Sequence, residues 1–159
     1  MSANITNLMP PIVGATADLE QRFILTQVER LTLVLPATWV TEIIRIDRSQ
    51  ILDLPFYDPL LVGIADRNGR IVPLIATDRL LEVAARSLPE RVVVVLLEDR
   101  GDRELANVGL IVDRAIGGST RQELPPELFT ANRTESMVMM RSALVPTNLW
   151  QPKYWSIDN

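Results

Sequence analysis

Cysteine and histidine are both absent from this sequence of 159 residues, and lysine occurs once, at Lys153. Without cysteine the chain has no disulfide and no thiol nucleophile, and without histidine it lacks the commonest general base and a common ligand of transition metals. An enzyme would have to use paired carboxylates, tyrosine, a hydroxyl or the single lysine. These absences argue against catalysis, a metal centre or any other cofactor.

Long hydrophobic runs are also missing. The longest, Val92 to Leu97 and Leu31 to Ala37, are far shorter than the roughly 20 residues that cross a bilayer. The first twenty residues have no basic start before their apolar residues and contain Asp18, so they do not resemble a secretory signal. We therefore expect a cytoplasmic protein that does not insert into membranes.

No excess of positive charge is present. The 16 basic residues are scattered, the 20 acidic residues outnumber them, and the net charge is −4. A protein of this kind has no electrostatic footprint for a phosphate backbone, so nucleic-acid binding is not expected.

What the sequence does contain is typical of a small globular protein, with 47% hydrophobic and 23% charged residues. Its length allows one ordinary domain or two small subdomains that share a core. Pro10, Pro11 and Gly14 lie in a stretch without sustained periodicity, so residues 1–20 are predicted to be a flexible tail. Residues 21–159 then form the folded domain.

Short runs of alternating or β-branched residues predict a series of strands. Asn68-Gly69 lies between two such runs, a pair of residues typical of a tight hairpin turn. The continuous run Val92 to Leu97 is typical of a strand buried on both faces, and we expect Val93, Val95, Leu110 and Val112 to be buried. The predicted strands and hairpins cover residues 22–35, 40–46, 61–75, 92–97, 108–112 and 137–140.

Two helices are predicted between and after these strands. Thr77 can begin a helix over residues 77–88, in which Leu80, Leu81 and Leu88 share one face. This helix would link two β subdomains with a boundary near residues 77–90. A second, short helix can start at Thr147.

Three segments, taken in this order, resemble the CheW-like domain. They are Val40-Thr41-Glu42-Ile43, the hairpin from Leu61 to Ile75 with Gly69 at its turn and Pro73 in its second strand, and Val108 to Asp113. The sequence departs from the family pattern before the turn glycine, where the usual arginine is Asn68 and an arginine, Arg67, stands one position earlier.

The resemblance implies an all-β fold of two five-stranded SH3-like barrels that share a hydrophobic core, with a connecting helix and a short C-terminal helix. It also implies a non-enzymatic adaptor without a cofactor, which couples the helical tip of a methyl-accepting chemoreceptor to a CheA-type histidine kinase in chemotaxis, twitching motility or phototaxis. The protein-binding residues that it implies are Glu42, Arg67, Asn68, Ile71 and Val92.

Other interpretations of the sequence stay open at this point. Glu42 can equally be an ordinary surface glutamate. The chain can be a small-ligand-binding β-barrel whose aromatic end, with Trp150, Tyr154 and Trp155, closes a pocket. An enzyme built on Asp and Glu pairs is the least favoured, because histidine is missing.

Overall fold

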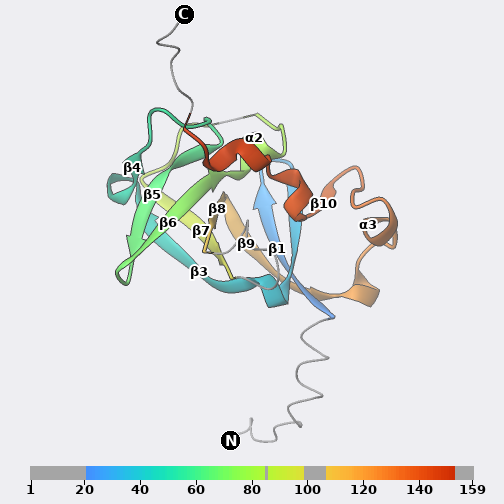
Figure 1. The fold of residues 1–159 in the computed structure, drawn as a ribbon. Helices are drawn as coiled ribbons and strands as arrows, with labels where there is room; N and C mark the ends of the chain where they lie inside the picture. Colours follow the sequence, from blue (N-terminus) through green and yellow to red (C-terminus); the bar gives the residue numbers. More distant parts are fainter. Residues whose placement is uncertain (1–20, 85, 99–106, 153–159) are drawn as a thin grey trace, which may run out of the picture.

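A computed structural model describes residues 21–84, 86–98 and 107–152 of the chain. The predicted tail, residues 1–20, lies outside these ranges. Within them, strands dominate and helices are short, which confirms the all-β class (Figure 1). The strands are β1 Arg22–Val28, β2 Leu31–Pro36, β3 Val40–Asp47, β4 Leu52–Asp53, β5 Leu61–Arg67, β6 Arg70–Ala76, β7 Arg91–Leu97, β8 Gly109–Val112, β9 Arg114–Thr120 and β10 Met137–Met139.

Two sheets organise these strands, and their members interleave along the sequence. One has the order β10-β2-β1-β9 and the other has the order β3-β7-β8-β6-β5-β4. Most pairs are antiparallel, whereas β10 runs parallel to β2 and β6 runs parallel to β8. The first sheet therefore joins the beginning of the described chain to its end. The subdomain boundary near residues 77–90 stays a prediction.

The six-stranded sheet curls into a barrel. Its two edge strands, β3 and β4, follow each other in the chain and are joined by a single 3-10 turn, Arg48–Gln50. Asp47 and Gln50 form a capping box at this turn, which fixes the bend between the two strands. Because β3 and β4 act as one bent strand, this sheet corresponds to one of the two five-stranded, SH3-like barrels that the family resemblance implies, while the other sheet has four strands.

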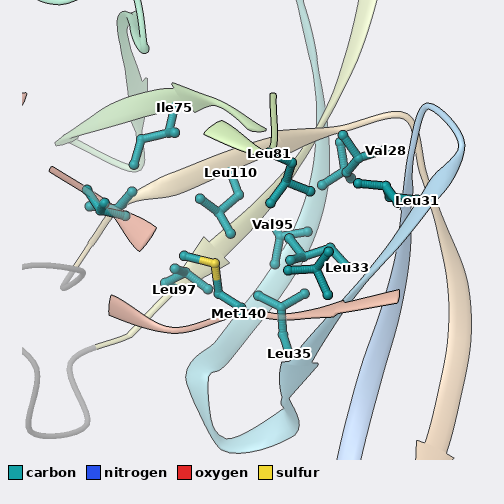
Figure 2. Packing of buried hydrophobic residues seen from close by; sticks show 14 of the residues in the cluster. Val28, Leu31, Leu33, Leu35, Ile75, Leu81, Val95, Leu97, Leu110 and Met140 are labelled. Carbon is teal, nitrogen blue, oxygen red and sulfur yellow. The ribbon is translucent and has the colours of Figure 1, made fainter. Parts of the chain in front are cut away.

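A shared hydrophobic core lies between the two sheets (Figure 2). The four-stranded sheet contributes Leu31, Leu33 and Leu35 from β2, and the barrel contributes Val95 and Leu110, all of them nearly or completely buried. A second core fills the barrel, and a third lies between the four-stranded sheet and helix α3, Glu127–Thr130. The 3-10 turn Thr147–Trp150, where a short C-terminal helix was expected, places Leu149 in the shared core.

Strand β7 separates two of these cores. Val92, Val94 and Leu96 face the barrel core, while Val95 and Leu97 face the shared core. This position explains the unbroken apolar run, because alternate side chains of a strand point to opposite faces. Burial of Val95, Leu110 and Val112 is confirmed, whereas Val93 is only half-buried, because it lies at the margin of the shared core.

The predicted helix over residues 77–88 is wrong in length. Helix α2, Thr77–Leu80, is a single turn. The Glu82 N–H donates to the Arg79 carbonyl and the Val83 N–H donates to the Asp78 carbonyl, which together are the Schellman pattern that ends a helix. Glu82 takes the left-handed conformation of that motif, with φ of 59°. Since this position usually holds glycine, the sequence gives little sign of the stop.

The predicted hairpins are confirmed at β1–β2 and β5–β6. In the second, Asn68 and Gly69 have φ of 55° and 82°, the two positive values that a tight type I′ turn requires. No helix in the described residues is long and apolar enough to cross a membrane.

Candidate protein-docking site at the barrel mouth

Glu42 lies on edge strand β3, where one face is exposed and the other is half-buried. Thr41, Ile43 and Arg45 point to solvent, while Glu42 and Ile44 point to the barrel side. Glu42 lies opposite Leu96 of β7, a member of the barrel core. The carboxylate thus lies at the boundary between the apolar interior of the barrel and solvent.

Arg67 approaches Glu42 from the other side of the barrel. It is the last residue of β5, just before the Asn68-Gly69 turn, and it faces the same side as Ala65, which is in the barrel core. Its Nη2 donates to Oε1 of Glu42 over 2.8 Å. β3 and β5 are not neighbours in the sheet, so this ion pair crosses the open end of the barrel, which we call the mouth.

The ion pair at the mouth contributes little to stability. The Arg67 and Glu42 side chains are 39% and 40% exposed, and pairs exposed to this degree are worth about 0.2–1 kcal/mol. Arg67 Nε is buried and has no hydrogen-bond partner in the described part of the chain, so the guanidinium is not fully satisfied. The arrangement is therefore better suited to recognition than to holding the fold together.

A cavity of about 410 Å³ opens at the mouth. Val72 and Leu96 give it an apolar floor, and charged and amide side chains surround the floor. Arg70 closes one side by donating from Nη1 to Asn107 Oδ1 over 3.3 Å. Apolar surface framed by polar groups is the usual composition of a protein-docking site. The full lining is Thr41, Glu42, Arg67, Asn68, Arg70, Val72, Leu96, Leu97, Glu98 and Asn107.

Beside the mouth, the outer surface of the barrel carries exposed apolar residues. Ile64 lies opposite both Leu52 and Pro73, and residues opposite each other in a sheet share a face. Ile71 lies on the same face, opposite Asp66. Leu52 and Ile71 are 65% and 60% exposed, which is unusual for such large apolar side chains. We call Leu52, Ile64, Ile71 and Pro73 the apolar stripe.

Four of the five predicted binding residues lie together at this end of the barrel. Glu42 and Arg67 form the ion pair, Asn68 is an exposed turn residue that lines the cavity, and Ile71 belongs to the apolar stripe. Val92 does not join them, because it is 1% exposed and packs in the barrel core. It is withdrawn as a contact residue.

The exposed apolar residues on β3 and β4 were not identified as candidate contacts by the sequence analysis. Leu52 follows the Arg48–Gln50 turn and pairs with β5, and Ile43 is 38% exposed on the solvent side of β3. The alternation of β3 carried a signal for Ile43, since it lies out of phase with Ile44 and Ile46. Leu52 had no such signal, because its strand has only two residues.

Trp150, the described residue of the aromatic C-terminal end, does not line any of the four cavities. Trp150 packs against the shared core, while Tyr154 and Trp155 lie outside the described residues. Among the residues that the structure covers, no cluster of three or more acidic side chains is placed to hold a metal ion.

Comparison with known proteins finds both a matching family and similar solved structures. The CheW-like domain family matches residues 22–135 of the chain. Among solved structures, the scaffolding protein TtCheW from Thermoanaerobacter tengcongensis is similar, with a TM-score of 0.59 and 18% sequence identity. That match covers 77% of this chain and 89% of TtCheW. No curated protein sequence matches the chain significantly.

Proposed function

Because the chain belongs to the CheW-like domain family, we propose that it is a non-enzymatic adaptor that couples a chemoreceptor to a CheA-type histidine kinase. A scaffold or adaptor role in chemotaxis is the general function that family membership supports. The pairing with a kinase and with the helical tip of a methyl-accepting receptor, in the cytoplasm, is the specific form proposed here. The protein would serve chemotaxis, twitching motility or phototaxis.

The apolar stripe beside the mouth carries this proposal. Ile71 and Leu52 stand largely in water on an outer surface of the barrel, next to the Glu42–Arg67 pair. Burying such side chains against a partner supplies affinity, while the neighbouring charges select the partner and set its orientation. We assign kinase contact to this surface, with Glu42, Arg67, Asn68 and Ile71 as the contact residues.

Receptor contact is assigned to the junction between the two sheets. Ile43 lies opposite Val95, so its side chain is on the face of β7 that forms the shared core, yet it is 38% exposed at the sheet edge. A receptor helix could place its apolar face against this margin, a common mode of peptide recognition. In this arrangement the two faces of β3 serve two different partners.

Binding measurements with single variants test the assignment. Ile71→Asp should weaken binding to the kinase at least about tenfold, because it places a charge in a desolvated contact. Receptor binding and the thermal midpoint should not change. Ile116→Asp is the matched control, since Ile116 is a 44% exposed isoleucine on β9, away from the stripe.

The reversal Glu42→Lys should weaken kinase binding as well, because it places a cation beside Arg67. The adaptor proposal fails if neither partner binds the unmodified protein. If both partners bind but Ile71→Asp and Glu42→Lys keep full kinase affinity, the adaptor role stands and the assigned surface is wrong.

A further inference from the structure

The connection into β7 crosses the molecule at the end of that strand opposite to the mouth. Residues Arg86 to Glu90 have no regular secondary structure and lead directly into Arg91, the first residue of β7. We call Arg86 to Glu90 the strap. It lies beside the turn between β1 and β2, which belongs to the other sheet, because its first residue contacts Glu29 in that turn.

Polar contacts hold the strap at both ends. At its start, Arg86 Nε pairs with Glu29 Oε2, and the Arg86 N–H donates to Asp78 Oδ2 over 3.3 Å. Toward its end, Arg48 Nη1 donates to the Leu88 carbonyl over 2.9 Å, and the Arg48 N–H donates to the Glu90 carbonyl over 2.8 Å. Leu88 is the strap residue that packs against the barrel core, and it is half-buried.

Glu29 is a prepared acceptor for Arg86. It has a left-handed backbone, with φ of 56°, in the β1–β2 turn, and its N–H donates to Asp113 Oδ2 over 2.7 Å. The Glu29 side chain is 18% exposed, whereas that of Arg86 is 67% exposed. The hydrogen bond and the charge of Glu29 raise the pKa of Arg86, which shows that this carboxylate stabilises the charged guanidinium. Glu29 is thus held in place, and Arg86 is the partner that can leave.

Two cavities flank the strap. One, of about 470 Å³, extends toward the loop that contains Tyr57, and the other, of about 400 Å³, extends toward β1 and β9. Both are lined by Arg86, Ser87 and Leu88 of the strap, together with Asp78 and Ile111. The strap is therefore a wall that the two cavities share.

We propose that the Arg86–Glu29 pair is a salt-sensitive latch, whose release lets the strap move away and joins the two cavities into one groove. Screening by salt weakens an exposed ion pair while the apolar cores keep their strength, so the latch can open without unfolding. The Arg86–Glu29 pair connects the barrel to the four-stranded sheet. Its release would loosen the connection between the two sheets at the end of β7 opposite to the mouth. This inference does not depend on which partners the adaptor binds.

The absence of native cysteine allows a direct test on the full chain. Leu88→Cys places one thiol on the strap, and its rate of modification by iodoacetamide, a neutral reagent, reports how often Leu88 is uncovered. Adding Arg86→Gln or Glu29→Gln should raise this rate about two- to five-fold, as expected for the loss of one exposed pair. Salt should raise the rate in Leu88→Cys alone and have little effect once Arg86→Gln is present.

Three controls keep the test decisive. Arg91→Gln removes the neighbouring exposed Arg91–Asp47 pair and should leave the labelling rate unchanged. A thiol at Val94, completely buried on β7, should stay unreactive in every variant. If Leu88→Cys disturbs the strap, Ile111→Cys, at a half-buried position that lines both cavities, serves as the reporter. Equal rates with and without Arg86→Gln, or a parallel rise at Val94, would overturn the latch.

Discussion

Strands β7 and β3 are hydrogen-bonded neighbours of similar β-branched composition, yet they have opposite roles. The side chains of β7 point into two cores, and Val94 and Val95 are completely buried. Strand β3 lies at the edge, where Thr41, Ile43 and Arg45 face solvent. The difference is one of neighbours: β7 is covered on both faces, while β3 is covered on one. Stability should depend on β7, and partner recognition on β3.

The largest test of this comparison uses two residues that lie directly opposite each other, Leu96 on β7 and Glu42 on β3. Leu96→Ala should lower the free energy of unfolding by about 2–4 kcal/mol, because it leaves a cavity in the barrel core. Denaturation by urea measures the loss. A change well under 1 kcal/mol would mean that β7 is not the structural strand we take it to be.

A second test concerns how tightly the barrel closes. A methyl group at Gly63 would lie 2.4 Å from the backbone oxygen of Leu52, whereas at Gly109 it would meet the side-chain ends of Val94 and Leu74 at 2.6 and 2.8 Å. Side chains can move more easily than backbone, so Gly63→Ala should cost more than Gly109→Ala, with overpacking costs of about 1–3 kcal/mol. Thermal unfolding of the two variants shows which substitution destabilises the protein more. Equal costs would show that β4 is loosely attached to β5.

Glu42→Ala should have a much smaller effect on stability. The loss should stay under about 1 kcal/mol, the range of an exposed pair, while binding to the kinase weakens. A double-mutant cycle with Arg67→Ala isolates the pair itself and should give a coupling of about 0.2–1 kcal/mol. If Glu42→Ala unfolds the protein, β3 is needed for stability as β7 is, and the two strands do not have separate roles.

The smallest expected effect lies away from both strands, at Glu123. Its carboxylate accepts hydrogen bonds from the Thr120 N–H, the Thr120 hydroxyl and the Ser119 hydroxyl, and these lower the pKa of Glu123 below its ordinary value of 4.5. The stabilisation is therefore complete above pH 4.5 and is lost as the pH falls through the lowered pKa. Glu123→Gln should reduce the free energy of unfolding slightly at neutral pH. It should also make the free energy of unfolding less dependent on pH in this acidic range. Urea midpoints measured across this range would show it, and a variant with an unchanged pH profile would contradict it.

Local patterns in the sequence were sufficient to predict most of the strands, but not the two-residue strand β4 and not the long-range contacts. The Asn68-Gly69 hairpin was predictable because two adjacent residues determine the turn. Arg67 and Glu42 are 25 positions apart, and they meet only because the barrel closes. The family resemblance implied Val92 as a contact residue, but the barrel core covers it. The early end of α2 depends on Glu82 taking a backbone conformation that glutamate rarely adopts.

The interleaved sheets have a consequence for how this protein can be divided and altered. β7 forms part of two cores, and β1 and β2 depend on β9 and β10 from the other end of the described chain. No cut in the middle of the chain yields a piece with a complete interior, so heat should melt the molecule in one calorimetric transition. New partners can then be acquired by changing outward-facing side chains on edge strands such as β3, and not by exchanging modules.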